Sequence, residues 1–275
     1  MSAPARREHG SREPGEVVLE AKGLSKSYGP IQALAGVDLV VRRGKLTAIV
    51  GDNGAGKTTL MKILAGAVRR DAGELLLRGE EVSFSSPIQA RQAGIETVYQ
   101  ELALAPNLDT VANIFLGREL MRNLAGLPLP LLRVLDSRRM RKLAREEIER
   151  LDVRIPRPVG LPVQQMSGGQ RQAVAIARAA FWASDVLLMD EPTAALGVVE
   201  SRAVLELVRK VLDDGMAVIM ISHVMPHVID LADHVVVLRH GEKVADLPGE
   251  GLTTTDIVQL IVGERDIVMG GTPLR

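Results

Sequence analysis

The sequence predicts an α/β fold whose mostly parallel sheet is flanked by helices. The first observation is a set of short apolar runs rich in β-branched residues, at 46–50, 186–189, 217–221 and 234–238. The second is that helical segments, such as 198–213, lie between these runs. Because buried strands that alternate with helices form parallel sheets covered on both faces, we expect that arrangement here.

The chain begins with a polar segment, 1–16, for which we expect a disordered tail. Strands are expected at 17–22 and 37–41. The segment between them, 23–36, is expected to be a loop, and it contains Tyr28.

A glycine-rich stretch at 51–59 follows the strand expected at 46–50 and precedes a helix expected at 57–65. It reads GDNGAGKTT and fits G-x-x-x-x-G-K-[ST], the phosphate-binding P-loop. Its glycines let backbone N–H groups turn inward, and the helix N-terminus adds partial positive charge. Lys57 can reach the outer phosphates of a nucleotide, and the Thr58 hydroxyl can hold Mg²⁺. The stretch therefore predicts a P-loop NTPase.

Further strands are expected at 73–78 and 95–99. From 106 to 163 the strand signals fade and helical ones take over, most clearly at 137–151. After residue 167 helices and strands alternate again, and a last helix is expected at 254–262.

Two carboxylates, Asp190 and Glu191, follow the strand expected at 186–189. A P-loop needs a second acidic site for Mg²⁺, and Asp190 can hold the ion through its water shell. Glu191, one residue further, can polarise an attacking water. Acidic pairs at strand ends are common, but one downstream of a P-loop indicates nucleotide hydrolysis.

The segment Ser-Gly-Gly-Gln at 167–170 has two interpretations. Ser167 with Gln170 forms a capping box that opens a helix, which needs no further function. The two glycines, however, are costly at a helix start. They suit a site where another molecule's phosphate approaches the backbone at the positive end of the helix.

Composition bounds the class of protein. The 275 residues are 46% hydrophobic and 25% charged, as in ordinary globular proteins. The formal net charge is zero, so nothing overall indicates nucleic acid as a partner. The absence of Cys excludes disulfides, thiolate zinc sites and cysteine catalysis. No secretory signal or apolar run of roughly 20 residues is present, so we expect the chain in the cytoplasm or on a membrane through a partner.

Five features in this order resemble the ATPase subunit of ABC transporters. They are the P-loop at 51–59, Gln100, the segment 167–170, the carboxylates at 190–191, and His223. The combination is highly specific, and the resemblance extends over nearly the whole chain.

The resemblance implies one ABC ATPase domain at 17–265, followed by a tail at 266–275. Within that domain it implies an N-terminal antiparallel β subdomain. It also implies a helical subdomain at about 101–183, inserted before the signature motif.

The resemblance also implies ATP and Mg²⁺ as cofactors. The residues implied to bind ATP are Tyr28, Gly51, Asn53, Gly54, Ala55, Gly56, Lys57, Thr58, Thr59, Ser167, Gly168, Gly169 and Gln170. Those implied to bind Mg²⁺ are Thr58, Gln100 and Asp190. The catalytic residues would be Glu191, His223 and Gln100.

Three of these residues also have plainer interpretations. Tyr28 matches the aromatic that stacks on adenine, but a Tyr in a loop between strands could equally be a packing residue. Gln100 matches the glutamine that senses Mg²⁺ and the attacking water, but a lone Gln is usually a surface residue. His223 matches the switch histidine that contacts the γ-phosphate, but a lone His at a strand end is more often a satisfied polar residue. His223 and His227 superficially resemble a two-histidine zinc helix, yet Pro226 would interrupt that helix.

In this family two subunits close head to tail over two ATP molecules, so the resemblance implies a second copy of the chain as a partner. The P-loop of one copy would then face Ser167 of the other. The helical insert, 101–165, is where the family docks onto transmembrane permease subunits. A periplasmic solute-binding protein, which delivers solute to the permease, is implied as an indirect partner. The implied location is therefore peripheral, on the cytoplasmic face of the inner membrane.

Two departures from the family pattern stand out. Met166 replaces the usual Leu and preserves volume and apolarity. Gly197 stands where most of the family has an Asp that helps communication between the two ATP sites. The surrounding TAALG at 193–197 is similar to the ATPases of bacterial monosaccharide importers, of the ribose, xylose and fructose type. Because the chain has one ATPase half, we expect a homodimer, as in the short fructose-type members.

Four functions remain open on the sequence. The first is an ATP-hydrolysing subunit that powers sugar import through separate membrane subunits. The others are a transporter ATPase for an amino acid, lipid or drug, a non-transport ABC ATPase acting on nucleic acid or ribosomes, and a binding-only regulator. Lys57 and Glu191 are both present, which disfavours a binding-only regulator. The sequence shows no coiled-coil arm or second ATPase half, either of which a non-transport ABC ATPase would normally carry.

Overall fold

The computed structural model describes residues 15–123, 133–155 and 159–263. The predicted tails at 1–16 and 266–275 therefore lie outside it, except for Gly15 and Glu16. These two residues are hydrogen-bonded to Arg43: the Gly15 N–H donates to the Arg43 carbonyl, and the Arg43 N–H donates to Glu16.

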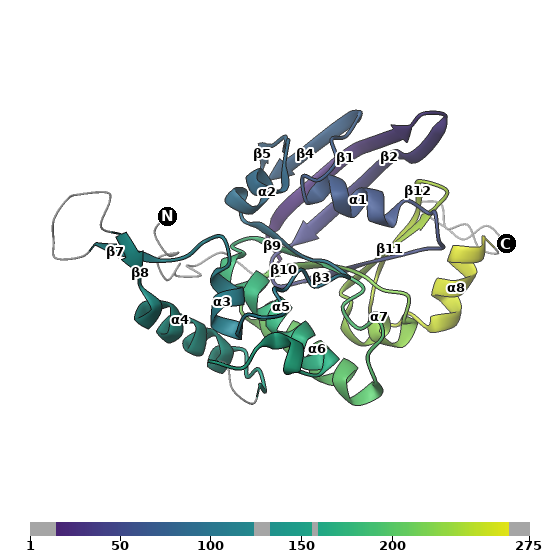
Figure 1. Ribbon diagram of the computed structural model, residues 1–275. Coiled ribbons are helices and arrows are strands. Elements are labelled where there is room, and N and C mark those ends of the chain that lie inside the picture. The colour runs from purple at the N-terminus through teal and green to yellow at the C-terminus, as the bar shows by residue number, and fades with distance from the viewer. Residues whose placement is uncertain (1–14, 124–132, 156–158, 264–275) are drawn as a thin grey trace.

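A six-stranded sheet forms the centre of the molecule (Figure 1). In spatial order its strands are β12 (Glu242–Pro248), β11 (His234–Arg239), β3 (Leu46–Val50), β10 (Ala217–Ile221), β9 (Val186–Asp190) and β6 (Ile95–Val98). All neighbouring pairs are parallel except β11 with the edge strand β12. The mostly parallel sheet predicted from the sequence is thus confirmed.

A second, antiparallel sheet covers one face of the first. Its order is β2 (Ile31–Arg42), β1 (Val17–Tyr28), β4 (Ala72–Leu77) and β5 (Glu80–Glu81). The antiparallel sheet expected in the N-terminal part is confirmed, but the loop expected at 23–36 is wrong. Both strands continue through it, and pairing reaches Tyr28 opposite Ile31, because bulges absorb the residues that break the alternation.

Helices lie on both faces of the central sheet. On the side of the antiparallel sheet are α1 (Lys57–Leu64) and α2 (Pro87–Ala93). On the other side are α5 (Gly168–Trp182), α6 (Val198–Asp213), α7 (Met225–Leu231) and α8 (Thr254–Val262).

Alternate side chains of each central strand enter two separate cores. On β3, Ile49 packs with the antiparallel sheet and α1, whereas Ala48 and Val50 pack with α5 and α6. On β9, Leu188 belongs to the first core and Leu187 to the second. A strand buried on both faces must be apolar throughout, which explains the continuous apolar runs in the sequence.

The segment between β6 and α5 contains the helices α3 (Thr110–Phe115) and α4 (Ser137–Arg150) and the 3₁₀ turn η2 (Val163–Gln165). It also contains a hairpin of β7 (Met121–Asn123) and β8 (Arg133–Leu135), which the sequence did not predict. A small core joins this segment to α5, where Phe115, Phe181 and Trp182 meet edge to face.

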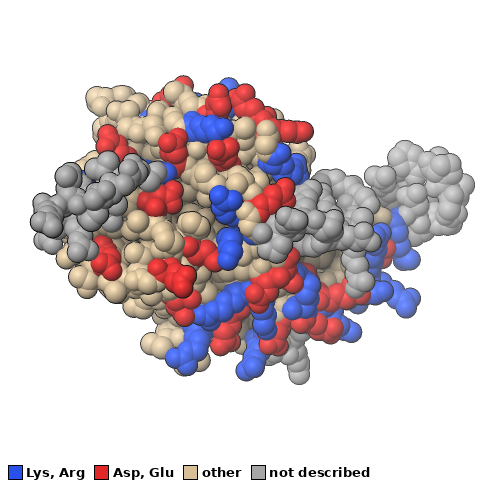
Figure 2. Space-filling model, turned by 180° about the vertical axis from the view of Figure 1, so that it is seen from behind, with Lys and Arg blue, Asp and Glu red and all other residues tan. Residues whose placement is uncertain are grey.

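Charges of both signs are interspersed over the face drawn in Figure 2. Several charges among the described residues pair: Lys210 on α6 contacts Asp152 at 2.8 Å, and Arg150 on α4 contacts both Glu147 and Asp214. Among the helices of the described residues, none combines the length and the apolar character that crossing a membrane requires.

Candidate functional site

Several of the predicted site residues lie together at the carboxyl ends of the central strands. In the parallel register, Ile49 lies opposite Ile221, Ile221 opposite Asp190, and Val98 opposite Met189. The carboxyl ends of β3, β10, β9 and β6 therefore lie side by side. The segments that leave these ends carry, in spatial order, the P-loop, His223, Asp190 with Glu191, and Gln100.

The P-loop is wrapped tightly against its surroundings. At Gly51 φ is +147°, and a Cβ there would lie 2.1 Å from the carbonyl oxygen of Leu238 on β11. At Gly56, the residue before α1, φ is +102° and a Cβ would lie 2.5 Å from the carbonyl oxygen of Ala33. Ala55 is buried between them, whereas Asn53 and Gly54 are exposed at the tip of the loop. The loop thus presents backbone to the solvent side while its base is fixed by packing.

Lys57 begins α1 and turns back into the loop. Its Nζ donates to the carbonyl oxygens of Gly51 and Asp52, at 2.7 and 2.8 Å. Burial lowers the pKa of Lys57, and the nearby carboxylates of Glu191, Asp52 and Asp190 oppose that shift. The ammonium group is therefore held where the P-loop and the acidic residues of β9 meet.

Glu191 and His223 form a pair across the ends of β9 and β10. The Glu191 Oε1 atom lies 2.8 Å from His223 Nε2. Glu191 has φ of +50°, and its N–H donates to the Ile221 carbonyl oxygen at 3.0 Å. Positive φ in a non-glycine residue is uncommon and is maintained only where the surroundings enforce it. The chain thus holds the Glu191 carboxylate beside the histidine.

Asp190 lies directly before this pair, at the last position of β9. Burial raises its pKa, and the neighbouring Glu191 carboxylate raises it further. Such a carboxylate is stabilised by a cation. The three residues predicted to hold Mg²⁺ all offer oxygen atoms, the ligands that this ion prefers, and Thr58 and Gln100 are exposed toward solvent.

Two expectations about nearby residues need correction. Tyr28 does not lie in a long loop: it ends β1, is 46% exposed, and has Lys26 Nζ 5.6 Å from its ring centroid. Pro226 does not interrupt a helix, because it lies in the first turn of α7, where proline is tolerated. His227 is turned to Thr193, with Nδ1 3.0 Å from the hydroxyl. The described residues contain no cluster of three or more His, Cys, Asp or Glu able to hold a metal ion.

The Ser167–Gln170 segment forms the capping box that the sequence predicts. The Ser167 side chain accepts from the Gln170 N–H at 3.2 Å, and the Gln170 side chain accepts from the Ser167 N–H at 2.9 Å. Ser167 is exposed. A Cβ added at Gly168 would lie 3.3 Å from the Leu196 side chain, and one added at Gly169 would lie 2.8 Å from the Glu200 side chain. Both of these residues are near the start of α6. In-chain packing therefore also accounts for Gly169, where the sequence suggested only a phosphate.

The match to a protein-family model decides the identity. Residues 34–194, more than half of the chain, match the model described as ABC transporter. This chain belongs to the ABC transporter family.

Curated relatives of this ABC ATPase agree with that assignment. It is 45% identical to the fructose import ATP-binding protein FrcA of Rhizobium meliloti, over 91% of the chain and 96% of the relative. It is 40% identical to the xylose/arabinose import ATP-binding protein XylG of Sulfolobus acidocaldarius, over 89% and 93%. It is 42% identical to the ribose import ATP-binding protein RbsA of Yersinia pestis, over 94% of the chain but 50% of the relative.

Solved structures of ABC cassettes share the fold. A nucleotide-free ATP-binding cassette from an ABC transporter superposes with a TM-score of 0.75 at 23% identity, covering 90% of this chain and 95% of that one. A dimeric cassette bound to ADP and Pi gives 0.67 at 25% identity, covering 85% and 100%.

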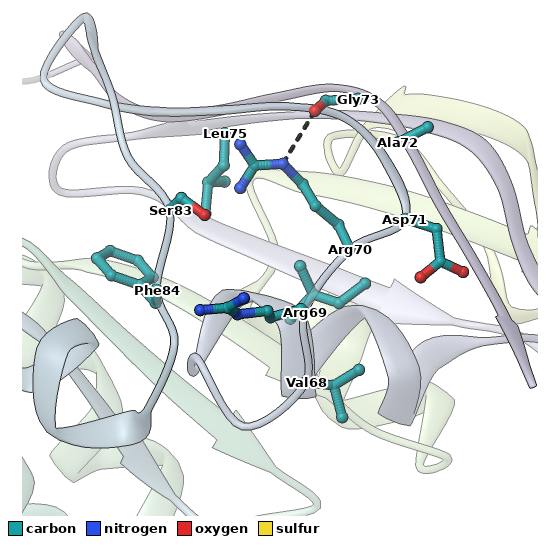
Figure 3. A pocket seen from close by; sticks show the side chains of 10 residues that line it. Val68, Arg69, Arg70, Asp71, Ala72, Gly73, Leu75, Ser83 and Phe84 are labelled. Carbon is teal, nitrogen blue, oxygen red and sulfur yellow. Dashed lines mark hydrogen bonds between the residues drawn. The ribbon is translucent and has the colours of Figure 1, made fainter.

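A cavity of about 350 Å³ opens between the end of α1 and β4 (Figure 3). Arg70 spans it, donating to the carbonyl oxygens of Gly73 and Val82 at 2.9 and 3.1 Å. Because these bonds satisfy the guanidinium, we interpret the cavity as part of the β4–β5 hairpin and not as a nucleotide site.

One residue of interest, Glu200, was not singled out in the sequence. An acidic side chain in the first turn of a helix is common, because its negative charge interacts favourably with the positive end of the helix dipole. Only its contact with Gly169, across α5 and α6, distinguishes it, and the sequence carries no signal for that contact.

Proposed function

We propose that this chain is the ATP-hydrolysing subunit of a transporter that imports a sugar. The observation that carries hydrolysis is the Glu191–His223 pair at 2.8 Å, on the same sheet edge as the P-loop. Sugar import is supported by relatives at 40–45% identity that are named for fructose and xylose/arabinose import.

Each residue of the edge has a role in this reaction. Lys57 and the P-loop N–H groups bind the phosphates, and Tyr28 stacks on the base. Glu191 accepts a hydrogen bond from the attacking water and polarises it, while His223 orients Glu191 and contacts the γ-phosphate. Thr58, Gln100 and Asp190 would hold Mg²⁺, which would neutralise charge on the phosphates.

The partners follow from this function. A second copy contributes Ser167, Gly168, Gly169 and Gln170 to each ATP site. Permease subunits dock against the helical insert, where a cavity of about 280 Å³ lies between α3, α5 and β6. Three arginines and one glutamate line that cavity, so it favours a segment with an acidic side chain. A periplasmic solute-binding protein delivers the sugar to the permease, and this chain lies on the cytoplasmic face of the membrane.

The direct test is Glu191→Gln, which keeps the size of the side chain and removes its basicity. We expect ATP turnover in the presence of the permease to fall at least about hundredfold, the usual contribution of a general base. Binding of ATP should persist. Undiminished turnover would refute the role of Glu191.

The cargo can be tested separately, since no residue described here contacts it. The chain is purified with its permease, and ATPase stimulation is measured with a series of solutes delivered by the matching binding protein. Stimulation by a monosaccharide supports the proposal, whereas stimulation by an amino acid or a lipid alone would replace sugar as the cargo.

A further inference from the structure

His227 is a histidine beside the ATPase site to which the proposed reaction gives no role. Its Nδ1 atom lies 3.0 Å from the Thr193 hydroxyl oxygen, a hydrogen-bond distance. Thr193 comes two residues after Glu191 and is only 6% exposed, so little water can replace the histidine as its partner. His227 lies on α7, four residues after His223. The hydrogen bond therefore joins the two segments that carry the Glu191–His223 pair.

The turn that carries Thr193, residues 191–196, requires support from outside itself. Glu191 and Ala195 both have positive φ, +50° and +58°, although neither is a glycine. Such a conformation is costly and persists only where the surrounding structure enforces it. Glu191 and Thr193 are the two polar side chains of this turn. Each of them contacts a histidine from the segment that follows β10, so this segment supports the turn at two points.

The segment between the two histidines is hydrogen-bonded within itself. The Ser222 hydroxyl oxygen accepts from the Val224 N–H at 3.1 Å, and the His227 N–H donates to the Val224 carbonyl oxygen at 2.9 Å. Pro226 lies in the first turn of α7 and restricts the backbone there. Because the segment is restrained in this way, fixing His227 also limits where His223 can lie.

We propose that His227 is a positioning residue for ATP hydrolysis, which holds the His223 segment against the Glu191 turn through its hydrogen bond to Thr193. The proposal rests on the hydrolysis proposed above. Neither His227 nor Thr193 contributes an atom to the reaction. Their bond keeps the catalytic pair at 2.8 Å before nucleotide arrives, and a preorganised pair needs less rearrangement in the transition state. Loss of the bond therefore slows the chemical step and leaves the binding of ATP unchanged.

The test measures kcat and KM for ATP, using the full-length chain with its permease. Thr193→Val removes the hydroxyl and keeps the shape of the side chain, and His227→Leu removes the imidazole. We expect each variant to lower kcat at least about fivefold, the usual contribution of one neutral hydrogen bond, and to change KM less than about twofold. The double variant should lose no more than either single variant, because all three lack the same bond.

Conservative variants separate the hydrogen bond from the bulk of the two side chains. Thr193→Ser keeps a hydroxyl, and His227→Asn keeps a donor and an acceptor near the Nδ1 position, so both should retain at least about half of the parent kcat. Thr110→Val is the matched control. Thr110 is fully buried, and its hydroxyl has no partner among the residues that the structure describes, so kcat should change less than about twofold.

The outcomes distinguish this inference from the function on which it rests. If the parent hydrolyses ATP and Thr193→Val and His227→Leu leave kcat unchanged, the inference is overturned, whereas the proposed function is not. Losses that add in the double variant also overturn it, because the two residues would then act separately. The same holds if neither Thr193→Ser nor His227→Asn retains turnover. If the parent itself does not hydrolyse ATP, the proposed function fails and the inference fails with it.

Discussion

At the scale of single residues, the P-loop depends on glycine for two different physical reasons. Gly51 is confined by β11, since a Cβ would lie 2.1 Å from the Leu238 carbonyl oxygen. Gly54 has φ of +84° but open space around it. At Gly51 both packing and backbone conformation exclude a side chain. At Gly54 only the backbone conformation disfavours one.

This difference gives a matched pair of variants. Gly51→Ala should lower the free energy of unfolding by at least about 3 kcal/mol, because backbone atoms of β11 must move. Gly54→Ala should lower it by only about 1 kcal/mol, the strain of positive φ in alanine. Urea denaturation of both variants measures the two costs. Equal losses would contradict the packing explanation.

The sequence predicted which residues lie together better than it predicted how they are held. The order of motifs singled out Lys57, Glu191 and His223, since each has a fixed place relative to its strand. It did not predict that Gly169 makes room for Glu200, because that contact joins two helices through tertiary packing.

At the scale of elements, a buried carboxylate fastens the antiparallel sheet to the central one. Asp185 is fully buried just before β9, and its two oxygens contact Arg43 at 2.9 Å and Arg78 at 3.0 Å. The arginines come from the end of β2 and the turn after β4. Removing the carboxylate leaves the buried Arg43 with only the more distant carboxylate of the exposed Glu16, at 3.8 Å, to compensate its charge.

We therefore expect Asp185→Ala to lower the free energy of unfolding by about 3–5 kcal/mol. Asp230→Ala is the control: Asp230 also pairs with an arginine, Arg209, but is 54% exposed, and its loss should cost at most about 1 kcal/mol. Thermal and urea unfolding compare the two. A small effect at Asp185 would show that the sheets are joined by apolar packing alone.

Asp71 gives the strands β1 and β4 a pH-dependent contact. Hydrogen bonds from the Lys26 ammonium and the Ser27 N–H lower the pKa of Asp71 below its ordinary value of 3.8. A group whose folded pKa is lowered contributes stability above its unfolded pKa and loses it as the pH falls through the folded pKa. Asp71→Asn should therefore be less stable than the parent at pH 7, and the difference should disappear in acid. A pH-independent difference in urea midpoints would argue against this ion pair.

The elements that sequence patterns predicted well are the buried strands and the long helices. Strand β10 is apolar throughout, and β3 is apolar except for the buried Thr47, because both faces are covered, and this gives a clear signal. The patterns failed where tertiary pairing overrides local preference. Glycine and serine in β1 read as a loop but are accommodated by bulges, and the three-residue strands of β7–β8 are too short to show periodicity.

At the scale of the whole molecule, the P-loop and the Ser167 turn, the two proposed halves of a shared ATP site, belong to different elements of the layered fold. The P-loop lies at the end of β3, on the edge of the central sheet. The Ser167 turn caps α5 and contacts the start of α6. Because Ser167 is exposed on its own chain, the proposal assigns it to the P-loop of a second copy. The sequence predicted this only through the family resemblance, since no local pattern encodes an assembly.

Mixing two inactive variants tests that claim most directly. Lys57→Ala disables the P-loop of a chain, and Ser167→Arg blocks its signature turn. If sites are shared between chains, a mixed dimer has one intact site, so an equimolar mixture should recover up to about a quarter of the parent ATPase activity. Neither variant alone should show activity. If the variants form mixed dimers and no activity returns, the two-chain site is contradicted.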